Sequence, residues 1–128
     1  MTEQRQLSAE PADADELAGV TACIADYCEG YAGGDEQRME RSLHAALVKR
    51  SIERDGIRTL DAPYMVRAAA KRQADGTAEL DPSWTIEFVD IRGDMAAAVV
   101  VTRQFHDYLH LGRFHGEWKV LNVLWARA

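Results

Sequence analysis

The stretch Asp107–Ala126, DYLHLGRFHGEWKVLNVLWA, decides the fold. It predicts two long antiparallel β-strands joined by a two-residue turn at His115-Gly116, because glycine adopts positive φ freely and histidine tolerates it better than most residues. Apolar residues fall on both faces of this predicted hairpin, whereas a sheet with one face in water shows a clean apolar and polar alternation. We therefore expect both faces of the hairpin to be covered.

The register of the hairpin follows from its turn. Counting back along an antiparallel pair places Leu111 opposite Val120, and opposed residues share a face of the sheet. The same count brings Asp107 opposite Leu124. The inner face is then expected to hold Asp107, Leu109, Leu111, Trp118, Val120, Asn122 and Leu124. The outer face is expected to hold Tyr108, His110, Phe114, Lys119, Leu121, Val123 and Trp125.

The outer face is too apolar to be left in water. Either an intramolecular layer or a second subunit could cover it, and no spare helix follows the hairpin before Ala128. A second subunit is the better explanation, because every layer of a fold must bury its apolar face against another layer. We predict a homodimer through the outer sheet face, formed by Tyr108, His110, Leu121, Val123 and Trp125.

The overall composition narrows the class of protein. A chain of 128 residues predicts one domain, with residues 1–13 as a flexible polar segment and residues 14–128 as the folded part. A net charge of −6 argues against nucleic acid or an anionic membrane as the main partner. No stretch approaches the ~20 apolar residues of a membrane span, and the N-terminus lacks the apolar region of a signal peptide, so we expect a cytoplasmic protein.

The chain before the hairpin predicts helices followed by strands. An apolar stripe at i, i+3, i+4 spacing indicates a helix that begins at Asp15 and ends at Gly33, and Asp35 can cap a short second helix. Turn residues and alternation indicate a charged hairpin within residues 47–60, a helix from Pro63, and strands at 84–92 and 95–104 with Trp84, Ile86 and Phe88 on one face. This order predicts an α+β fold, in which three helices and a short hairpin pack on a curved antiparallel sheet to form a cone with a pocket at its open end.

Three segments of the chain carry a family resemblance. They are IADYCEGYAGGDEQRMERSLHAALVKRSI (Ile24–Ile52), RGDMA (Arg92–Ala96) and DYLHLGRFHGEWKVLNVLW (Asp107–Trp125). Together they resemble the nuclear transport factor 2-like superfamily, also called cystatin-like, and most closely its "putative lumazine-binding" group. The resemblance implies a cone-shaped α+β fold that dimerises through the outer sheet face. It also implies a range of functions, which includes ketosteroid isomerase-like and dehydratase-like enzymes, SnoaL-like polyketide cyclases and ligand-binding modules.

Asp107 is the candidate catalytic residue. On the inner face beside Leu124, an apolar wall would raise the pKa of its carboxyl group and suit it to proton transfer. Alternatively, Asp107 touches solvent at the start of the strand and pairs with Arg103. Asn122 on the same face could donate to a ligand carbonyl, or it could satisfy a buried backbone group.

Candidate ligand-binding residues also come from other parts of the chain. Tyr27 and Tyr31 follow the core-facing stripe of the first helix, where they could line a cavity or belong to the core. Trp118 and Trp84 could form a stacking wall for a flat ligand, or they could belong to the core. His44 could lie at the pocket mouth, or it could hydrogen-bond to the nearby loop.

The sequence predicts no metal site and no cofactor. Cys23 and Cys28 are separated by about 140° around a helix axis, so they cannot pair with each other and fit small buried positions instead. His110 is expected on the face opposite Asp107, which separates the two possible ligands. Neither a glycine-rich phosphate loop nor a nucleophile–histidine–acid arrangement is present.

These observations lead to one main hypothesis and two alternatives. The main hypothesis is a pocket for a small apolar or aromatic molecule. The first alternative is a cofactor-free isomerase or dehydratase that uses Asp107, with Tyr31 or His44 as a hydrogen-bond donor. The second is a dimeric structural or interaction module whose cone is filled by its own side chains. Whether the protein is an enzyme stays open at this level.

Overall fold

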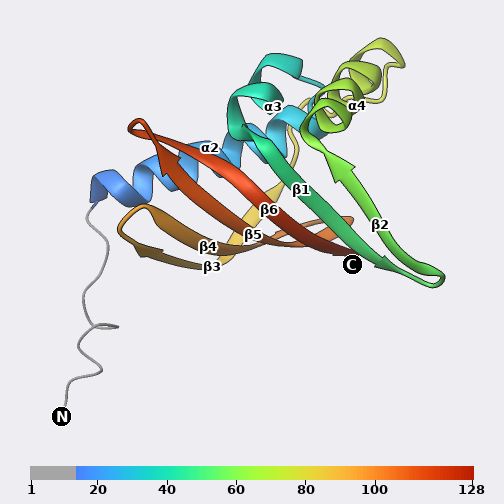
Figure 1. Cartoon of the computed structure of the whole chain (residues 1–128). Coiled ribbons are helices and arrows are strands. Elements are labelled where there is room, and N and C mark those ends of the chain that lie inside the picture. The colour runs from blue at the N-terminus through green and yellow to red at the C-terminus, as the bar shows by residue number, and fades with distance from the viewer. Residues whose placement is uncertain (1–13) are drawn as a thin grey trace.

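The computed structural model describes residues 14–128, and the flexible segment expected over residues 1–13 lies outside the described residues. The elements run in the order helix, helix, hairpin, helix, hairpin, hairpin (Figure 1). The helices are α2 (Ala14–Ala32), α3 (Glu36–Ser42) and α4 (Ala62–Ala74). The strands are β1 (Leu43–Glu53), β2 (Gly56–Asp61), β3 (Trp84–Arg92), β4 (Met95–Thr102), β5 (Phe105–Phe114) and β6 (Glu117–Arg127).

The helix ends follow from local chemistry. After α2 the chain turns at Gly34, whose φ of 69° is a conformation that glycine adopts without strain. The Asp35 carboxylate then caps α3 by accepting a hydrogen bond from the Arg38 backbone N–H at 3.1 Å. Asp61 caps α4 in the same way and accepts from the Tyr64 backbone N–H at 2.9 Å.

The six strands form one curved sheet in the order β2-β1-β6-β5-β4-β3. The sheet is mixed rather than purely antiparallel, because β1 pairs parallel with β6 while all the other neighbours are antiparallel. The chain passes through four strands and α4 between β1 and β6, and this long connection returns β6 alongside β1 in the same direction, which a tight turn cannot do. β1 also begins at Leu43, so His44, expected just after the second helix, already belongs to a strand.

The predicted turn of the last hairpin is confirmed. His115 and Gly116 both have positive φ, at 52° and 81°, as a two-residue hairpin turn requires. The predicted register is also confirmed as far as Leu111, which pairs with Val120.

Beyond Val120 the predicted register is wrong. A β-bulge adds one unmatched residue to β6, so that His110 pairs with Asn122 and Asp107 pairs with Trp125. One extra residue turns every later side chain to the opposite face. Val123 and Trp125, predicted on the outer face, therefore lie on the concave side, and Asn122 lies exposed on the outer face.

A second bulge corrects the face predicted for β3. The register shifts between Ile86 and Phe88, so Ile86 pairs with Val100 on the concave side while Phe88 pairs with Val99 and is 54% exposed. Bulges bend a strand and increase its twist. The two bulges lie in different strands, β3 and β6, and both contribute to the curvature of the sheet.

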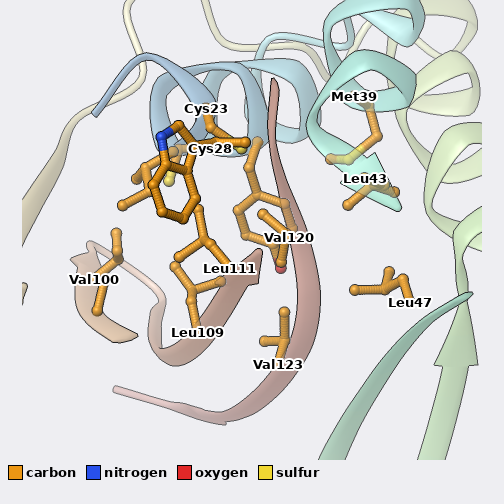
Figure 2. Close-up of a cluster of buried hydrophobic side chains, with 14 of the residues drawn as sticks. Cys23, Cys28, Met39, Leu43, Leu47, Val100, Leu109, Leu111, Val120 and Val123 are labelled. Carbon is orange, nitrogen blue, oxygen red and sulfur yellow. The ribbon is translucent and has the colours of Figure 1, made fainter. Parts of the chain in front are cut away.

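The core lies between α2 and the concave face of the sheet (Figure 2). Cys23 and Cys28 of α2 point toward the strands, as do Met39 and Leu43 from the α3–β1 junction. The opposing strand residues drawn there are Leu47, Val100, Leu109, Leu111, Val120 and Val123. Both cysteines are free and buried, which confirms the prediction made for them.

Candidate functional site

A cavity of about 170 Å³ lies where α2 and α4 meet the concave face of the sheet. Aromatic side chains from both helices and from the strands form much of its wall. They are Tyr27, Tyr31, Tyr64, Trp84, Phe105 and Trp125. The ring centroid of Phe105 lies 5.2 Å from that of Trp125 and 6.5 Å from that of Tyr31, so these rings form a continuous apolar lining.

Three polar side chains meet in the wall of this cavity: Lys49 from β1, Asp107 from β5 and Tyr27 from α2. The Lys49 Nζ donates to the Tyr27 hydroxyl at 2.6 Å, and the hydroxyl donates to Asp107 Oδ2 at 3.4 Å. The same Nζ lies 5.1 Å from the ring centroid of Tyr27 and 5.6 Å from that of Trp125. The cavity thus combines a cation, a hydroxyl and a carboxylate with aromatic surface.

Burial changes the acidity of all three groups. It raises the pKa of the Asp107 carboxyl, and the positive charge of Lys49 only partly offsets this effect. Burial likewise lowers the pKa of the Lys49 ammonium, against the attraction of Asp107. The pKa of Tyr27 is raised well above its ordinary value by burial and by the nearby carboxylate. A carboxyl and an amine whose pKa values move toward each other are suited to exchanging a proton with a bound molecule.

The cavity also gathers unsatisfied hydrogen-bonding atoms. Across residues 14–128, three buried side-chain nitrogen or oxygen atoms have no hydrogen-bond partner: Arg72 Nε, Asp107 Oδ1 and Trp125 Nε1. All three belong to residues that line the cavity. An unpartnered buried polar atom costs about 1–3 kcal/mol, so native structures keep few of them. Their concentration here indicates a place where a ligand or water can complete the hydrogen bonding.

A second group of charges lies on the Glu79 side of the cavity. The Arg72 guanidinium lies 4.8 Å from the ring centroid of Tyr31 and donates to the Thr77 carbonyl at 3.1 Å. Glu79 accepts from Arg103 at 3.2 Å and lies 3.7 Å from Arg72. These contacts join the loop after α4 to the helix and to the β4–β5 turn, so the cavity wall on this side is held by charged pairs.

The structure brings together four of the seven residues proposed from the sequence. Tyr27, Tyr31, Trp84 and Asp107 line the cavity. Asp107 is buried and contacts Tyr27, rather than pairing with Arg103 at the surface.

Asn122, Trp118 and His44 do not line the cavity. Asn122 lies on the outer face because of the bulge in β6. Trp118 packs at the other end of α2, where a Cβ added to Gly19 would come within 2.9 Å of its indole Cδ1. His44 accepts a hydrogen bond from the Ala46 backbone N–H at 2.9 Å and packs on Phe114, so its hydrogen bond is local but lies within β1 rather than with a loop.

Lys49 and Trp125 are among the cavity residues that were missed in the sequence. Lys49 carried a usable signal, because it lies two residues from both Leu47 and Ser51 on a strand and therefore shares their face, which is buried in the structure. Trp125 carried none, because the bulge that turns it inward follows from the packing of β6 between two strands.

Three further findings for residues 14–128 concern the Cys28 thiol, metal ligands and membrane-spanning helices. Burial raises the pKa of the Cys28 thiol to about 12, so this cavity residue stays a neutral thiol. In this part of the chain no group of three or more His, Cys, Asp or Glu side chains could hold a metal ion. None of its helices combines the length and apolar character needed to cross a bilayer.

Known structures share this architecture of helices over a curved sheet. An NTF2-like protein of unknown function from Silicibacter pomeroyi superposes with a TM-score of 0.79 at 18% identity, covering 92% of this chain and all of that one. An NTF2-like protein of unknown function from Shewanella baltica gives 0.79 at 16%, covering 93% and 98%. A ketosteroid isomerase-like protein from Erwinia carotovora atroseptica gives 0.64 at 13%, covering 90% and 98%. At these identities the similarity establishes the fold class, which is nuclear transport factor 2-like.

The family follows from the sequence match. The family model described as "Putative lumazine-binding" matches residues 15–126, and this chain belongs to that family. Among curated proteins no match to the chain is found. The expected superfamily and group are therefore both confirmed.

Proposed function

We propose that the cavity binds one small apolar or aromatic molecule. The observation that carries this proposal is the coincidence of an aromatic wall with three unpartnered buried polar atoms on residues of the same cavity. Pockets for small molecules combine mostly apolar lining with a few convergent polar groups. Here Asp107 and Trp125 supply an acceptor and a donor at neighbouring positions, because their backbones pair across β5 and β6.

The cavity volume limits the size of the ligand. A cavity of about 150 Å³ in another protein holds one benzene molecule, and the present cavity measures about 170 Å³. One six-membered ring therefore fits inside. A two-ring or three-ring heterocycle, such as a pterin or flavin, would extend through the mouth.

This proposal is tested by filling the cavity. Ala68 of α4 lines it, whereas Ala22 of α2 is exposed and outside it. Ligand-observed NMR against a set of one-ring compounds is expected to detect binding to the wild type and to Ala22→Phe, and little or none to Ala68→Phe. Native mass spectrometry of the purified protein would identify any retained molecule. If no one-ring compound binds to a folded wild-type protein, the cavity is a packing feature and the interaction-module alternative takes its place.

A second candidate function is proton transfer on a bound carbonyl compound. The contact of Tyr27 with both Lys49 and Asp107 favours it, because a buried carboxylate beside a hydrogen-bond donor can remove and return a proton. In this arrangement Tyr27 and Lys49 take the donor role that the sequence assigned to Tyr31 or His44. The protein would act as an isomerase or dehydratase without a cofactor.

Deuterium exchange provides the test for this second candidate. In D₂O, the wild type is expected to exchange α-protons of a one-ring ketone that binds the cavity, and Asp107→Asn is expected to lose most of this exchange. Asp90→Asn, at an exposed position of β3, is the matched control. Equal exchange rates for the wild type and Asp107→Asn would show that Asp107 does not remove the proton. The proton-transfer proposal would then be wrong, and the binding proposal would remain.

We also propose that the chain forms a homodimer through the outer sheet face. The bulges revise its composition: Tyr108, His110 and Leu121 remain candidates, while Val123 and Trp125 lie on the concave side. In their place, Phe88 joins the outer face, and a row of paired residues crosses four strands. It consists of Phe88, Val99, Tyr108 and Leu124, of which the first, third and fourth are 54%, 61% and 46% exposed. Such a continuous apolar row is self-complementary across a two-fold axis, which favours a second copy as its cover.

Sedimentation velocity tests the dimer. Tyr108→Glu is expected to yield monomers, because it places a charge in the centre of the proposed contact. Leu80→Glu, at a fully exposed loop position, is expected to leave the assembly unchanged. A wild-type protein that sediments as a monomer would contradict the proposal.

A further inference from the structure

The charge around the cavity differs in sign from that of the whole chain. The protein has 15 basic and 21 acidic side chains, a net charge of −6. The cavity is lined by five basic and two acidic ones, a formal excess of three positive charges. The basic residues are Lys49, Arg58, Arg72, Arg103 and Arg127, and the acidic ones are Glu79 and Asp107. A cavity of one sign in a protein of the other sign raises the local concentration of oppositely charged ligands.

Most of these charges already have a protein partner. Arg72 and Arg103 share Glu79, and Lys49 faces Asp107 through Tyr27. Arg58 and Arg127 differ from them. Within residues 14–128 neither forms an ion pair with a carboxylate. Arg58 donates to the Tyr64 hydroxyl at 2.8 Å. The guanidinium carbon of Arg127 lies 5.7 Å from the ring centroid of Phe105.

The sheet places these two exposed arginines on its concave face, with β1 between their strands. Arg58 pairs with Ser51 across β2 and β1, and Ser51 pairs with Trp125 across β1 and β6. Arg127 follows Trp125 by two residues on β6, so it shares the concave face about 7 Å further along. The end of β6 runs beside β1 toward the β1–β2 turn (Figure 1). Glu53 accepts from the Ser51 hydroxyl at 2.5 Å and does not line the cavity.

We infer that the cavity takes a one-ring aromatic carboxylate, with its acid group held by Arg58 and Arg127; this rests on the binding function proposed above. The volume admits one ring, and the ring lies against the wall formed by Tyr31, Phe105 and Trp125. The carboxylate points to the mouth rather than inward, because the inner wall already contains Asp107. Arginine is suited to this role, since its planar guanidinium binds a carboxylate through two parallel hydrogen bonds.

Titration calorimetry with three matched probes tests the inference. Phenylacetate, the neutral phenylacetamide and the cationic phenethylamine share one ring and differ in charge. Phenylacetate is expected to bind roughly tenfold more tightly than phenylacetamide, the effect of one or two charge-assisted hydrogen bonds at a partly exposed site. Phenethylamine is expected to bind most weakly, and added salt is expected to weaken phenylacetate alone among the three by a large factor.

Variants test whether Arg58 and Arg127 bind the acid group of the ligand. The double variant Arg58→Gln/Arg127→Gln is expected to bind phenylacetate and phenylacetamide equally. Arg50→Gln is the matched control, because Arg50 lies on β1 with its side chain on the outer face and outside the cavity. It is expected to keep the tenfold preference for phenylacetate.

The outcomes separate this inference from the proposal beneath it. If phenylacetamide binds as tightly as phenylacetate, the carboxylate inference is overturned and the apolar pocket remains. If the preference survives in the double variant, these two arginines do not hold the acid group and the inference is equally overturned. If none of the three probes binds, and the wider one-ring set also fails, the binding function itself is wrong.

Discussion

The two ends of α2 cover opposite ends of the same sheet, but they do so with different chemistry. At the N-terminal end, Val20 and Ile24 are completely buried and Trp118 packs on Gly19, so apolar groups fill the space. At the C-terminal end, Tyr27 and Tyr31 face a cavity that contains a lysine and an aspartate. A well-packed end provides stability, which allows the other end to keep unsatisfied polar atoms and unfilled volume. The difference places the cavity at the C-terminal end of α2.

The largest expected effect comes from emptying the packed end. Ile24→Ala removes a fully buried side chain and is expected to lower the free energy of unfolding by about 3 kcal/mol, within the range of roughly 2–5 kcal/mol for such truncations. The corresponding change at the cavity end, Leu60→Ala, removes a half-buried residue that already borders open space and should cost roughly 1 kcal/mol. Urea unfolding measures both, and equal losses would show that the two ends do not differ in packing.

The next effect tests which residues face inward after the bulge in β6. Val123 is 3% exposed, and Val123→Ala is expected to cost about 2 kcal/mol of unfolding free energy. Its neighbour Asn122 is exposed on the outer face, and Asn122→Ala is expected to change that free energy by less than about 0.5 kcal/mol. A larger loss of unfolding free energy for Asn122→Ala than for Val123→Ala would show that β6 pairs with β5 without the bulge.

A smaller effect concerns the charged pair in the cavity. Lys49→Met leaves the buried Asp107 without its cation, and we expect it to destabilise the protein at neutral pH by about 1–2 kcal/mol. Adding Asp107→Asn removes the carboxylate charge as well and is expected to recover most of that loss. If the two changes are simply additive in urea unfolding, Lys49 and Asp107 do not interact.

The smallest effect is a shift in titration. Because burial raises the pKa of Asp107 while Lys49 lowers it, Lys49→Met is expected to raise that pKa further. A carboxyl with a raised pKa in the folded state favours folding while it is protonated, so its contribution is lost as the pH rises through that value. In Lys49→Met this loss should occur at a higher pH than in the wild type. Carboxyl ¹³C chemical shifts measure the pKa directly, and an unchanged value would exclude an interaction with Lys49.

Much of the fold was predictable because it rests on local chemistry. The turn at His115-Gly116 needs two residues that tolerate positive φ, and the caps at Asp35 and Asp61 need short acceptor side chains at the first turn of a helix. These signals lie within a few residues of the feature they specify. The inward position of Tyr27 on α2 was likewise predictable from helical periodicity.

The parts that could not be predicted depend on contacts between distant segments. No local pattern marks the bulge in β6, which forms because this strand must pair with β5 on one side and with β1 on the other. That single extra residue exchanged Asn122 for Trp125 in the cavity wall. The grouping of Tyr27, Lys49 and Asp107 likewise arises only when three segments meet.

Sequence alone therefore determined the elements, their order, the superfamily and Asp107 as an inward-facing acid, because periodicity and turn chemistry act over short distances. Only the tertiary structure decided which residues surround that acid, that a cavity remains between the helices and the sheet, and that its lining has more basic than acidic groups in an acidic protein. The physical reason is that cavity shape and pKa depend on side chains that are far apart in the chain, and their placement is set by strand register and helix packing rather than by local preference.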